Sequence, residues 1–268
     1  MLFINGLVNK NIEKGFNLRD AQNIAAEEII LRKIASSELA NHITLKGGIV
    51  MFNISKNNRR VTQDIDFDLI RYSIDEKSIK LFFKKLSSVN DGIDVVVQDN
   101  IERLHQEDYQ GVRVRVVLKD KNKSSLKLKL DIGVHTYTAI EQESIVFYFD
   151  SSSDGVSMFV NPPEQLFCEK LLSLARLGAL SSRYKDLYDM YYLIHENILK
   201  IDKVREILKL FFDNSKRKPD SIIELNNIIH LTLSNSSFIK EASSTRSRLL
   251  DVEYADIKNR ITGFIEKL

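Results

Sequence analysis

The stretch Leu45–Ile70, LKGGIVMFNISKNNRRVTQDIDFDLI, decides the fold and the chemistry expected of this chain of 268 residues. It contains a glycine pair, Gly47 and Gly48, followed by Asp64 and Asp66. A glycine pair lets the backbone approach a phosphate closely, because no Cβ intervenes. Aspartates two residues apart on a strand point to the same side of the sheet. A phosphate cradle beside paired carboxylates is what Mg²⁺-dependent chemistry on a nucleotide requires.

The composition is typical of a globular protein, with 43% hydrophobic and 28% charged residues. No run of about 18 apolar residues occurs, so we expect no membrane contact. The N-terminal residues lack the features of a signal peptide. The single cysteine, Cys168, excludes an intrachain disulfide and fits a reducing cytosol, so we expect a cytoplasmic protein. The five histidines show no zinc-like spacing, and the net charge of +2 leaves nucleic-acid affinity to local basic patches.

The N-terminal half reads as an α+β domain in which helices and period-two strands alternate. Helices are expected at 17–39, 49–54 and 75–89, and strands at 43–45, towards the end of 60–70, and at 92–97, 112–116, 126–134 and 145–149. A serine-rich turn at 151–155 and the Asn161-Pro162-Pro163 step then break the pattern.

The C-terminal half reads as helical throughout. Helices are expected at 163–177, 182–195, 202–212, 219–233 and 251–267, with a serine-rich loop at 234–247. We therefore predict two domains, an α/β domain at 1–157 and a helical domain at 158–268.

The aspartates of the decisive stretch are candidate ligands for one or two Mg²⁺ ions, although a solvated strand is the simpler reading of an isolated Asp-x-Asp. Electrostatics favours the metal, because two carboxylates about 6 Å apart repel by roughly 3 kcal/mol at an effective dielectric constant of about 20. Asp68, on the same side, adds to this repulsion. If the strand containing Asp131 pairs beside that of Asp64 and Asp66, three carboxylates converge, and the third can be a metal ligand or general base. Otherwise Asp131 is an exposed edge-strand charge.

Basic residues on the neighbouring strands admit two interpretations. These residues are Arg113, Arg115, Lys127 and Lys129. They could form a basic surface that binds RNA phosphates, or they could simply be the polar side of a half-exposed sheet. For each residue taken alone we prefer the second interpretation. The lone His135 is expected to be structural.

The helical half carries one further informative stretch, residues 161–193. An apolar stripe there is expected to be core: Phe167, Leu171 and Leu174. Charged residues open the following helix, and by pattern alone they form a salt-bridged helix surface: Arg183, Lys185, Asp186 and Asp189.

Taken together, these residues resemble the AbiEii/AbiGii-type toxins, abortive-infection proteins with a minimal nucleotidyltransferase fold of the DNA polymerase β type. The family pattern is a glycine pair, R-x-T-x-D-x-D, an acidic strand residue, E-K on a helix, and R-x-K-D-x-x-D. The matching positions occur in order: Gly47-Gly48, Arg60, Thr62, Asp64, Asp66, Asp131, Glu169-Lys170, Arg183, Lys185, Asp186 and Asp189. Ile49 replaces the Ser or Thr that broader nucleotidyltransferases carry after the glycines, which removes a side-chain phosphate donor.

The resemblance implies a mixed β-sheet with flanking helices followed by a C-terminal helical bundle. It also implies metal-dependent transfer of a nucleotide from a nucleoside triphosphate (NTP) to an acceptor, which in relatives can be the 3′ end of tRNA. Mg²⁺, or Mn²⁺, would be held by Asp64, Asp66 and Asp131. Nucleotide contacts would come from Gly47, Gly48, Arg60, Thr62, Lys170, Arg183 and Lys185, and catalytic roles extend to Lys170 and Asp186. Such toxins usually accompany an antitoxin with a DNA-binding domain.

Two other functions remain open at this point. One is a catalytically silent nucleotide- or RNA-binding module, against which the retained carboxylates argue. The other is a metal-dependent nuclease, since three carboxylates also suit hydrolysis.

Overall fold

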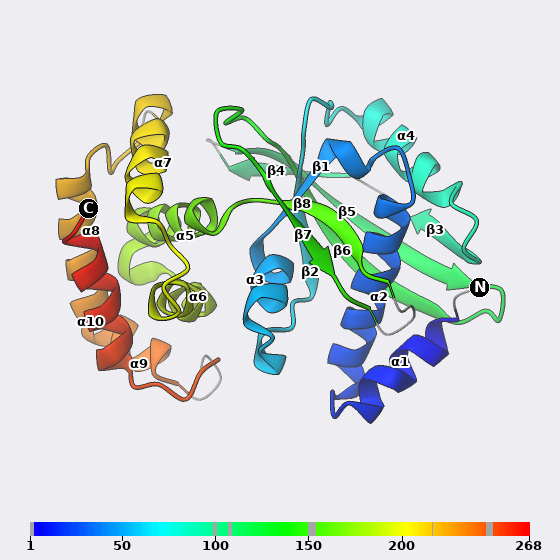
Figure 1. Cartoon of the computed structure of the whole chain (residues 1–268), viewed down its shortest axis with the longest axis horizontal. Coiled ribbons are helices and arrows are strands. Elements are labelled where there is room, and N and C mark those ends of the chain that lie inside the picture. The colour runs from blue at the N-terminus through cyan, green and yellow to red at the C-terminus, as the bar shows by residue number, and fades with distance from the viewer. Residues whose placement is uncertain (1–2, 99–100, 107–108, 150–153, 216, 245–248) are drawn as a thin grey trace. The chain divides into compact units, whose positions relative to one another are not determined.

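The computed structural model describes residues 3–98, 101–106, 109–149, 154–215, 217–244 and 249–268. The chain divides into two compact units, Met1–Asn161 and Pro162–Leu268. The first unit contains all the strands that the described ranges include, and the second contains helices only (Figure 1). This confirms the α+β class.

The first unit consists of four helices and an eight-stranded sheet within the described residues. The helices are α1 (Ile4–Glu13), α2 (Leu18–Ala35), α3 (Gly47–Ser55) and α4 (Glu76–Ser87). The strands are β1 (Ile43–Lys46), β2 (Asp64–Leu69), β3 (Ile93–Val97), β4 (Glu102–Gln106), β5 (Tyr109–Asp120), β6 (Ser125–Val134), β7 (Glu143–Phe147) and β8 (Val156–Val160).

The strand order is β3-β5-β6-β2-β1-β8-β7, and β4 pairs with β5 off this path. The pairs β2–β6 and β1–β8 are parallel, whereas the other pairs are antiparallel, so the sheet is mixed. Five strands, β5, β6, β2, β1 and β8, each have a neighbour on both sides. Side chains on these strands are therefore held in a fixed register.

Alternation along β2 separates a core side from a polar side. Ile65 and Phe67 are fully buried, and the Phe67 ring stacks on Phe82 of α4 with ring centroids 5.7 Å apart. The aspartates alternate with these residues and project to the opposite side. Figure 1 shows α1, α2 and α4 beside the sheet, and α2 contacts both β6 and β8.

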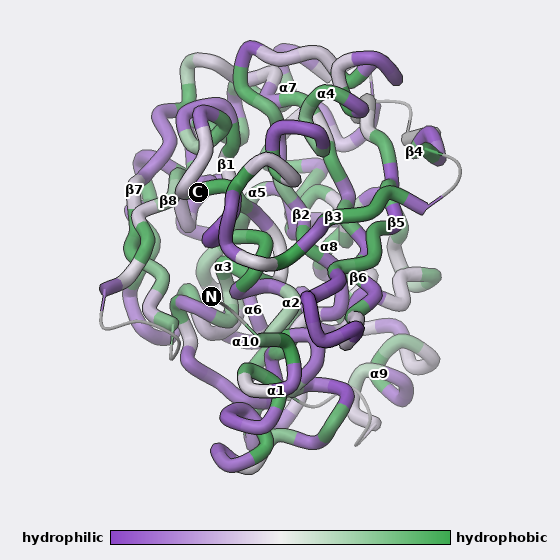
Figure 2. The backbone as a smooth tube through the Cα atoms, turned by 90° about the vertical axis from the view of Figure 1, so that its right-hand side faces the viewer, coloured by the Kyte–Doolittle hydropathy of each residue, from purple (hydrophilic) through white to green (hydrophobic). Residues whose placement is uncertain are grey.

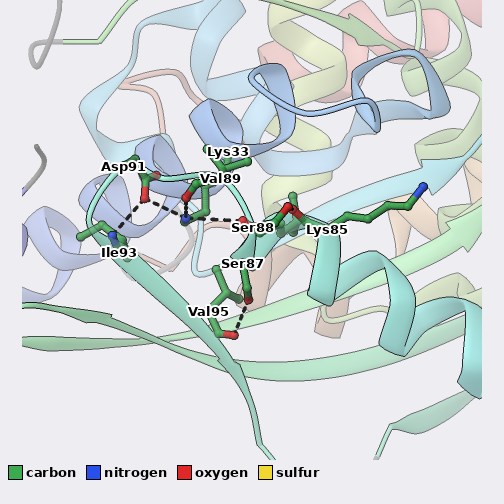
Figure 3. Close-up of polar contacts among 9 residues, drawn as sticks. Lys33, Lys85, Ser87, Ser88, Val89, Asp91, Ile93 and Val95 are labelled. Carbon is green, nitrogen blue, oxygen red and sulfur yellow. Dashed lines mark hydrogen bonds and ion pairs between the residues drawn. The ribbon is translucent and has the colours of Figure 1, made fainter.

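A fully buried lysine, Lys33 of α2, forms hydrogen bonds with the turn after α4 (Figure 3). Its ammonium group donates to the carbonyl oxygen of Val89 at 3.2 Å and to Asp91 Oδ1 at 2.8 Å. The same Asp91 oxygen accepts the backbone N–H of Ile93, where β3 begins, at 2.9 Å. A buried charge is tolerated only when it is paired and hydrogen-bonded, and this one is both.

The second unit contains six helices within the described residues: α5 (Pro163–Leu177), α6 (Tyr184–His195), α7 (Ile201–Asn214), α8 (Ile222–Ser234), α9 (Ser236–Ala242) and α10 (Tyr254–Ile265). The predicted apolar stripe is confirmed as core, because Phe167 and Leu171 are fully buried and Leu174 is 4% exposed. Phe167 packs edge-on against Phe264 of α10, with ring centroids 5.2 Å apart.

Among the described residues, two α-helices and two strands were not predicted from the sequence patterns: α1, β4, β8 and α9. Helix α9 corrects the expected loop at 234–247, because Ser236–Ala242 is helical. Most of the turn expected at 151–155 lies outside the described residues. Figure 2 shows hydrophobic and hydrophilic stretches interspersed along the chain, and no helix of the described part is long and apolar enough to cross a membrane.

Candidate active site

The four aspartates singled out by the sequence lie on two neighbouring parallel strands. Strand β2 carries Asp64, Asp66 and Asp68, and β6 carries Asp131. The register places Asp66 directly opposite Asp131 and Asp64 opposite Lys129. The strand that contains Asp131 therefore pairs directly with the strand of Asp64 and Asp66, the condition under which Asp131 was expected to be the third carboxylate. Paired residues project to the same side of the sheet, about 5 Å apart at the backbone.

We call this side of the sheet the polar face. Its charged residues come from β1, β2, β5 and β6 and are brought together by the register of these strands: Lys46, Asp64, Asp66, Asp68, Arg113, Arg115, Lys129 and Asp131.

The glycine pair borders the polar face, at the point where β1 runs into α3. Gly47 has a φ of +66°, which an L-residue rarely adopts, and a Cβ built on it would lie 3.1 Å from the Asp66 Cγ. A Cβ on Gly48 would lie 2.7 Å from Thr62 Oγ1 and 2.9 Å from an Arg60 nitrogen. Only glycine leaves room for these three motif side chains so close to the backbone. The glycine pair therefore packs directly against Arg60, Thr62 and Asp66 from the second half of the 45–70 stretch.

Thr62 and Arg60 each interact with another residue of the first unit. The Thr62 hydroxyl donates to the backbone oxygen of Asp64 at 3.1 Å, which fixes the start of β2. Arg60 is buried and acts electrostatically on Glu27 of α2. Burial raises the pKa of Glu27 well above its ordinary value, and the Arg60 charge opposes that rise only in part.

Three aspartates of the polar face are paired with cations of the protein. Lys129 Nζ lies 2.7 Å from Asp64 Oδ2, and Lys46 Nζ lies 2.7 Å from Asp68 Oδ1. Arg113 donates to both oxygens of Asp131, from Nε at 2.8 Å and from Nη2 at 2.7 Å.

These pairs change the electrostatic argument made from the sequence. Repulsion among the carboxylates does not by itself require a metal ion, because lysine and arginine side chains supply the compensating charge. Arg113 and Lys129 belong to the basic set noted in the sequence, whereas Arg115 pairs with Glu102 and Lys127 is exposed. Lys46 was not predicted from the sequence as a residue of this site, although its position directly before Gly47 could have indicated it.

His135 lies on the same strand side as Asp131 but is buried beyond the end of β6. Burial lowers its pKa, and Gln142 Nε2 lies 3.4 Å from its Nε2. Gln142 in turn accepts the hydroxyl of the buried Thr44 at 2.6 Å. This is the environment of a structural histidine.

The donor chemistry of the polar face suits a hard divalent cation, because carboxylate oxygens are the ligands that Mg²⁺ and Mn²⁺ prefer. Asp64, Asp66 and Asp131 offer such oxygens on adjacent registered strands. Among the described residues, no group of three or more His, Cys, Asp or Glu side chains has its donors gathered around one point. The residue types and the backbone therefore fit a metal, while the side chains of Asp64 and Asp131 turn towards their basic partners.

The motif residues of the second unit form a separate ion network. Lys170 of α5 is 6% exposed and lies 2.6 Å from Asp186 Oδ1 and 2.8 Å from Asp189 Oδ2, both on α6. Arg183 Nε donates to the other Asp186 oxygen at 2.8 Å.

This network corrects the expectation of a salt-bridged helix surface, because both aspartates and Lys170 are buried between α5 and α6. The spacing within α6 could not show this, since the buried cation comes from the preceding helix. Arg183 and Lys185, in contrast, are exposed.

The comparisons agree with these motifs. Residues 29–267 match the model of one family, described as nucleotidyl transferase AbiEii toxin, type IV TA (toxin–antitoxin) system. The match spans most of the chain, and the chain therefore belongs to the AbiEii nucleotidyl transferase toxin family of type IV toxin–antitoxin systems.

Other comparisons add little. No curated protein matches the chain. Among solved structures, it is similar to an antigenic nucleotidyltransferase-like protein from Paracoccidioides brasiliensis, with 17% identity, a TM-score of 0.41, and coverage of 74% of this chain and 88% of that one. A likeness of this size supports neither the function nor the site.

Proposed function

We propose that this nucleotidyltransferase transfers a nucleotide from an NTP to an RNA acceptor, with the 3′ end of tRNA as the expected target. One observation supports this above all: Asp66 and Asp131 are adjacent in register on the polar face, and the glycine pair packs against Asp66.

In this reaction the acceptor hydroxyl oxygen attacks the α-phosphorus of the NTP. A new P–O bond forms, the bond to the bridging oxygen breaks, and pyrophosphate leaves. Asp131 accepts the hydroxyl proton. A divalent ion held by Asp64, Asp66 and Asp131 would neutralise charge on the phosphates when bound.

The other contributions come from the chain itself. Backbone N–H groups at the start of α3, at Gly47 and Gly48, bind phosphate oxygens, because a helix N-terminus presents unpaired donors to an anion. Arg60 and Thr62 stand against Gly48 and hold this turn in place. We assign the exposed Arg183 and Lys185 to nucleotide or RNA phosphates, and the buried Lys170 and Asp186 to bracing the α5–α6 pair.

The test is transfer of label from an α-³²P-labelled NTP to purified tRNA with Mg²⁺ or Mn²⁺. Asp64→Asn and Asp66→Asn should each abolish labelling while the circular dichroism spectrum stays native. Asp94→Asn is the matched control, because Asp94 is an exposed aspartate on β3 of the same sheet. Label that persists in both site variants would overturn the assigned roles.

The two competing functions give different results in the same assay. A silent binding module would retain NTP without labelling RNA. A nuclease would shorten the RNA on a sequencing gel instead of lengthening it.

We also propose that the partner is a cognate antitoxin with a DNA-binding domain, as membership of a toxin–antitoxin family suggests. Expression of this chain alone should arrest growth, and co-expression of the adjacent reading frame should relieve the arrest. Arrest by the Asp66→Asn variant would contradict the link between toxicity and transfer.

A further inference from the structure

Asp131 differs from Asp64 in how completely its carboxylate is hydrogen-bonded to a cation of the protein. Arg113 stands opposite it in the β5–β6 register and donates to both of its carboxylate oxygens. The two hydrogen bonds, at 2.8 and 2.7 Å, make a bidentate guanidinium–carboxylate pair. Such pairs fix orientation as well as charge, because the planar guanidinium matches the carboxylate.

The pair at Asp64 is looser. Lys129 reaches a single oxygen of Asp64 at 2.7 Å, and the two side chains are 30% and 36% exposed. In the Arg113–Asp131 pair the carboxylate is only 17% exposed, so water competes less for it. An ammonium group on a flexible chain also yields its place more readily than a two-point guanidinium.

A divalent ion and Arg113 need the same Asp131 oxygens. Each oxygen already accepts one charged donor, so half of the lone pairs of this carboxylate are occupied, and a cation bound through the others lies beside the positive charge of Arg113.

We propose that Arg113 is a built-in competitor for the divalent metal at Asp131, a positioning residue whose positive charge and two hydrogen bonds weaken metal binding by this carboxylate. The inference rests on the proposed function, in which Asp131 is the third carboxylate of the metal site. It adds that this chain binds metal more weakly than its three carboxylates alone would.

The same strand supplies a matched control. Arg115 lies two residues further along β5, on the polar face, and pairs with Glu102 of β4 instead of with a site aspartate. Removing either arginine takes one positive charge from the same strand. Only removal of Arg113 takes hydrogen bonds and a paired charge from a carboxylate of the site.

The experiment is an isothermal titration calorimetry measurement in which MnCl₂ is added to the full chain in the absence of nucleotide. Arg113→Gln should lower the Kd for Mn²⁺ by about tenfold, the scale of losing one strong charge-assisted competitor. Arg115→Gln should stay within about twofold of the wild type. Arg113→Lys, which keeps the charge but loses the two-point geometry, should fall between the two.

The outcomes separate this inference from the proposed function. If the wild type binds Mn²⁺ and Arg113→Gln binds it equally or more weakly, the competition is wrong and the metal site stands. If no variant binds Mn²⁺, the metal role fails and the inference fails with it. If Arg113→Gln melts early, the comparison of Arg113→Lys with the wild type decides, and an unchanged Kd overturns the competition.

Discussion

Asp66 and Asp131 stand opposite one another on the parallel strands β2 and β6. Two ionised carboxylates at the spacing of adjacent strands repel by about 3 kcal/mol at an effective dielectric constant of about 20. The same face carries Lys46, Arg113 and Lys129, each within ion-pair distance of a neighbouring aspartate. The polar face is therefore electrostatically balanced, and ligands must exchange with partners already present.

The first prediction concerns Gly47→Ala. Alanine at a φ of +66° is strained by about 1–2 kcal/mol, and its Cβ would press on the Asp66 carboxylate. We expect the free energy of unfolding to fall by about that amount and nucleotide transfer to fall by at least about tenfold, because a carboxylate of the site is displaced. Urea denaturation and the tRNA-labelling assay measure the two effects.

Gly263→Ala is the control for this substitution. Gly263 lies inside α10, and a Cβ there would meet nothing within 4 Å. Alanine should stabilise this helix by about 0.5–1 kcal/mol and leave transfer unchanged. If Gly47→Ala behaved in the same way, the close approach of Gly47 to Asp66 would have no functional meaning.

Local patterns in the sequence predicted most of the elements around this site. The alternation that defines β2 and β6, and the helix over 163–177, follow from short-range periodicity and are present in the structure. Strand β8, VSMFV, was missed because it is short and lies between a serine-rich turn and a Pro-Pro step. It is stabilised by its parallel pairing with β1, which is remote in sequence.

The contacts of the site were less predictable than its residue types. The pairing of Arg113 with Asp131 depends on the register of two strands, which neither strand reveals alone. The burial of Lys170 depends on how α5 packs on α6. In both cases the sequence identified charged residues correctly, and tertiary packing chose their partners.

The second prediction concerns Lys33→Met. The substitution leaves the carbonyl of Val89 and the Asp91 carboxylate without their buried donor. Breaking a buried pair from one side costs about 3–5 kcal/mol, so we expect a loss of about that size in the free energy of unfolding. The exposed Lys80→Met, which breaks a surface pair with Glu76, should leave stability unchanged. Equal effects of the two variants would show that Lys33 contributes no more than a surface charge.

The third prediction separates bracing from ligand binding in the second unit. Lys170→Met leaves Asp189 and one oxygen of Asp186 buried without this cation, and we expect a loss of about 3 kcal/mol in the free energy of unfolding. Arg183→Gln, at a side chain 56% exposed, should leave stability nearly unchanged. It should instead raise the KM for NTP or tRNA if the guanidinium contacts phosphate. A stable Lys170→Met protein would contradict the bracing role.

The fourth prediction concerns pH and Glu27. Burial raises the pKa of this carboxyl well above 4.5, so the folded chain binds a proton that the unfolded chain releases. The stabilisation from the protonated form is complete below about pH 4.5 and is lost as pH rises towards the folded-state pKa. Glu27→Gln stays neutral and escapes this loss. The variant should therefore gain stability over the wild type as pH rises from 5 to 8 in urea unfolding.

Glu76→Gln is the matched control, because Glu76 is exposed and its pKa is lowered by a hydrogen bond from Lys80. A lowered carboxyl pKa has the opposite sign: its stabilisation is present above the ordinary pKa and disappears only in acid. Between pH 5 and 8 the Glu76→Gln and wild-type curves should therefore run parallel. If the Glu27→Gln curve also ran parallel to the wild type, Glu27 would be ionised in the fold throughout this range, with Arg60 balancing its charge, and the buried neutral carboxyl would be wrong.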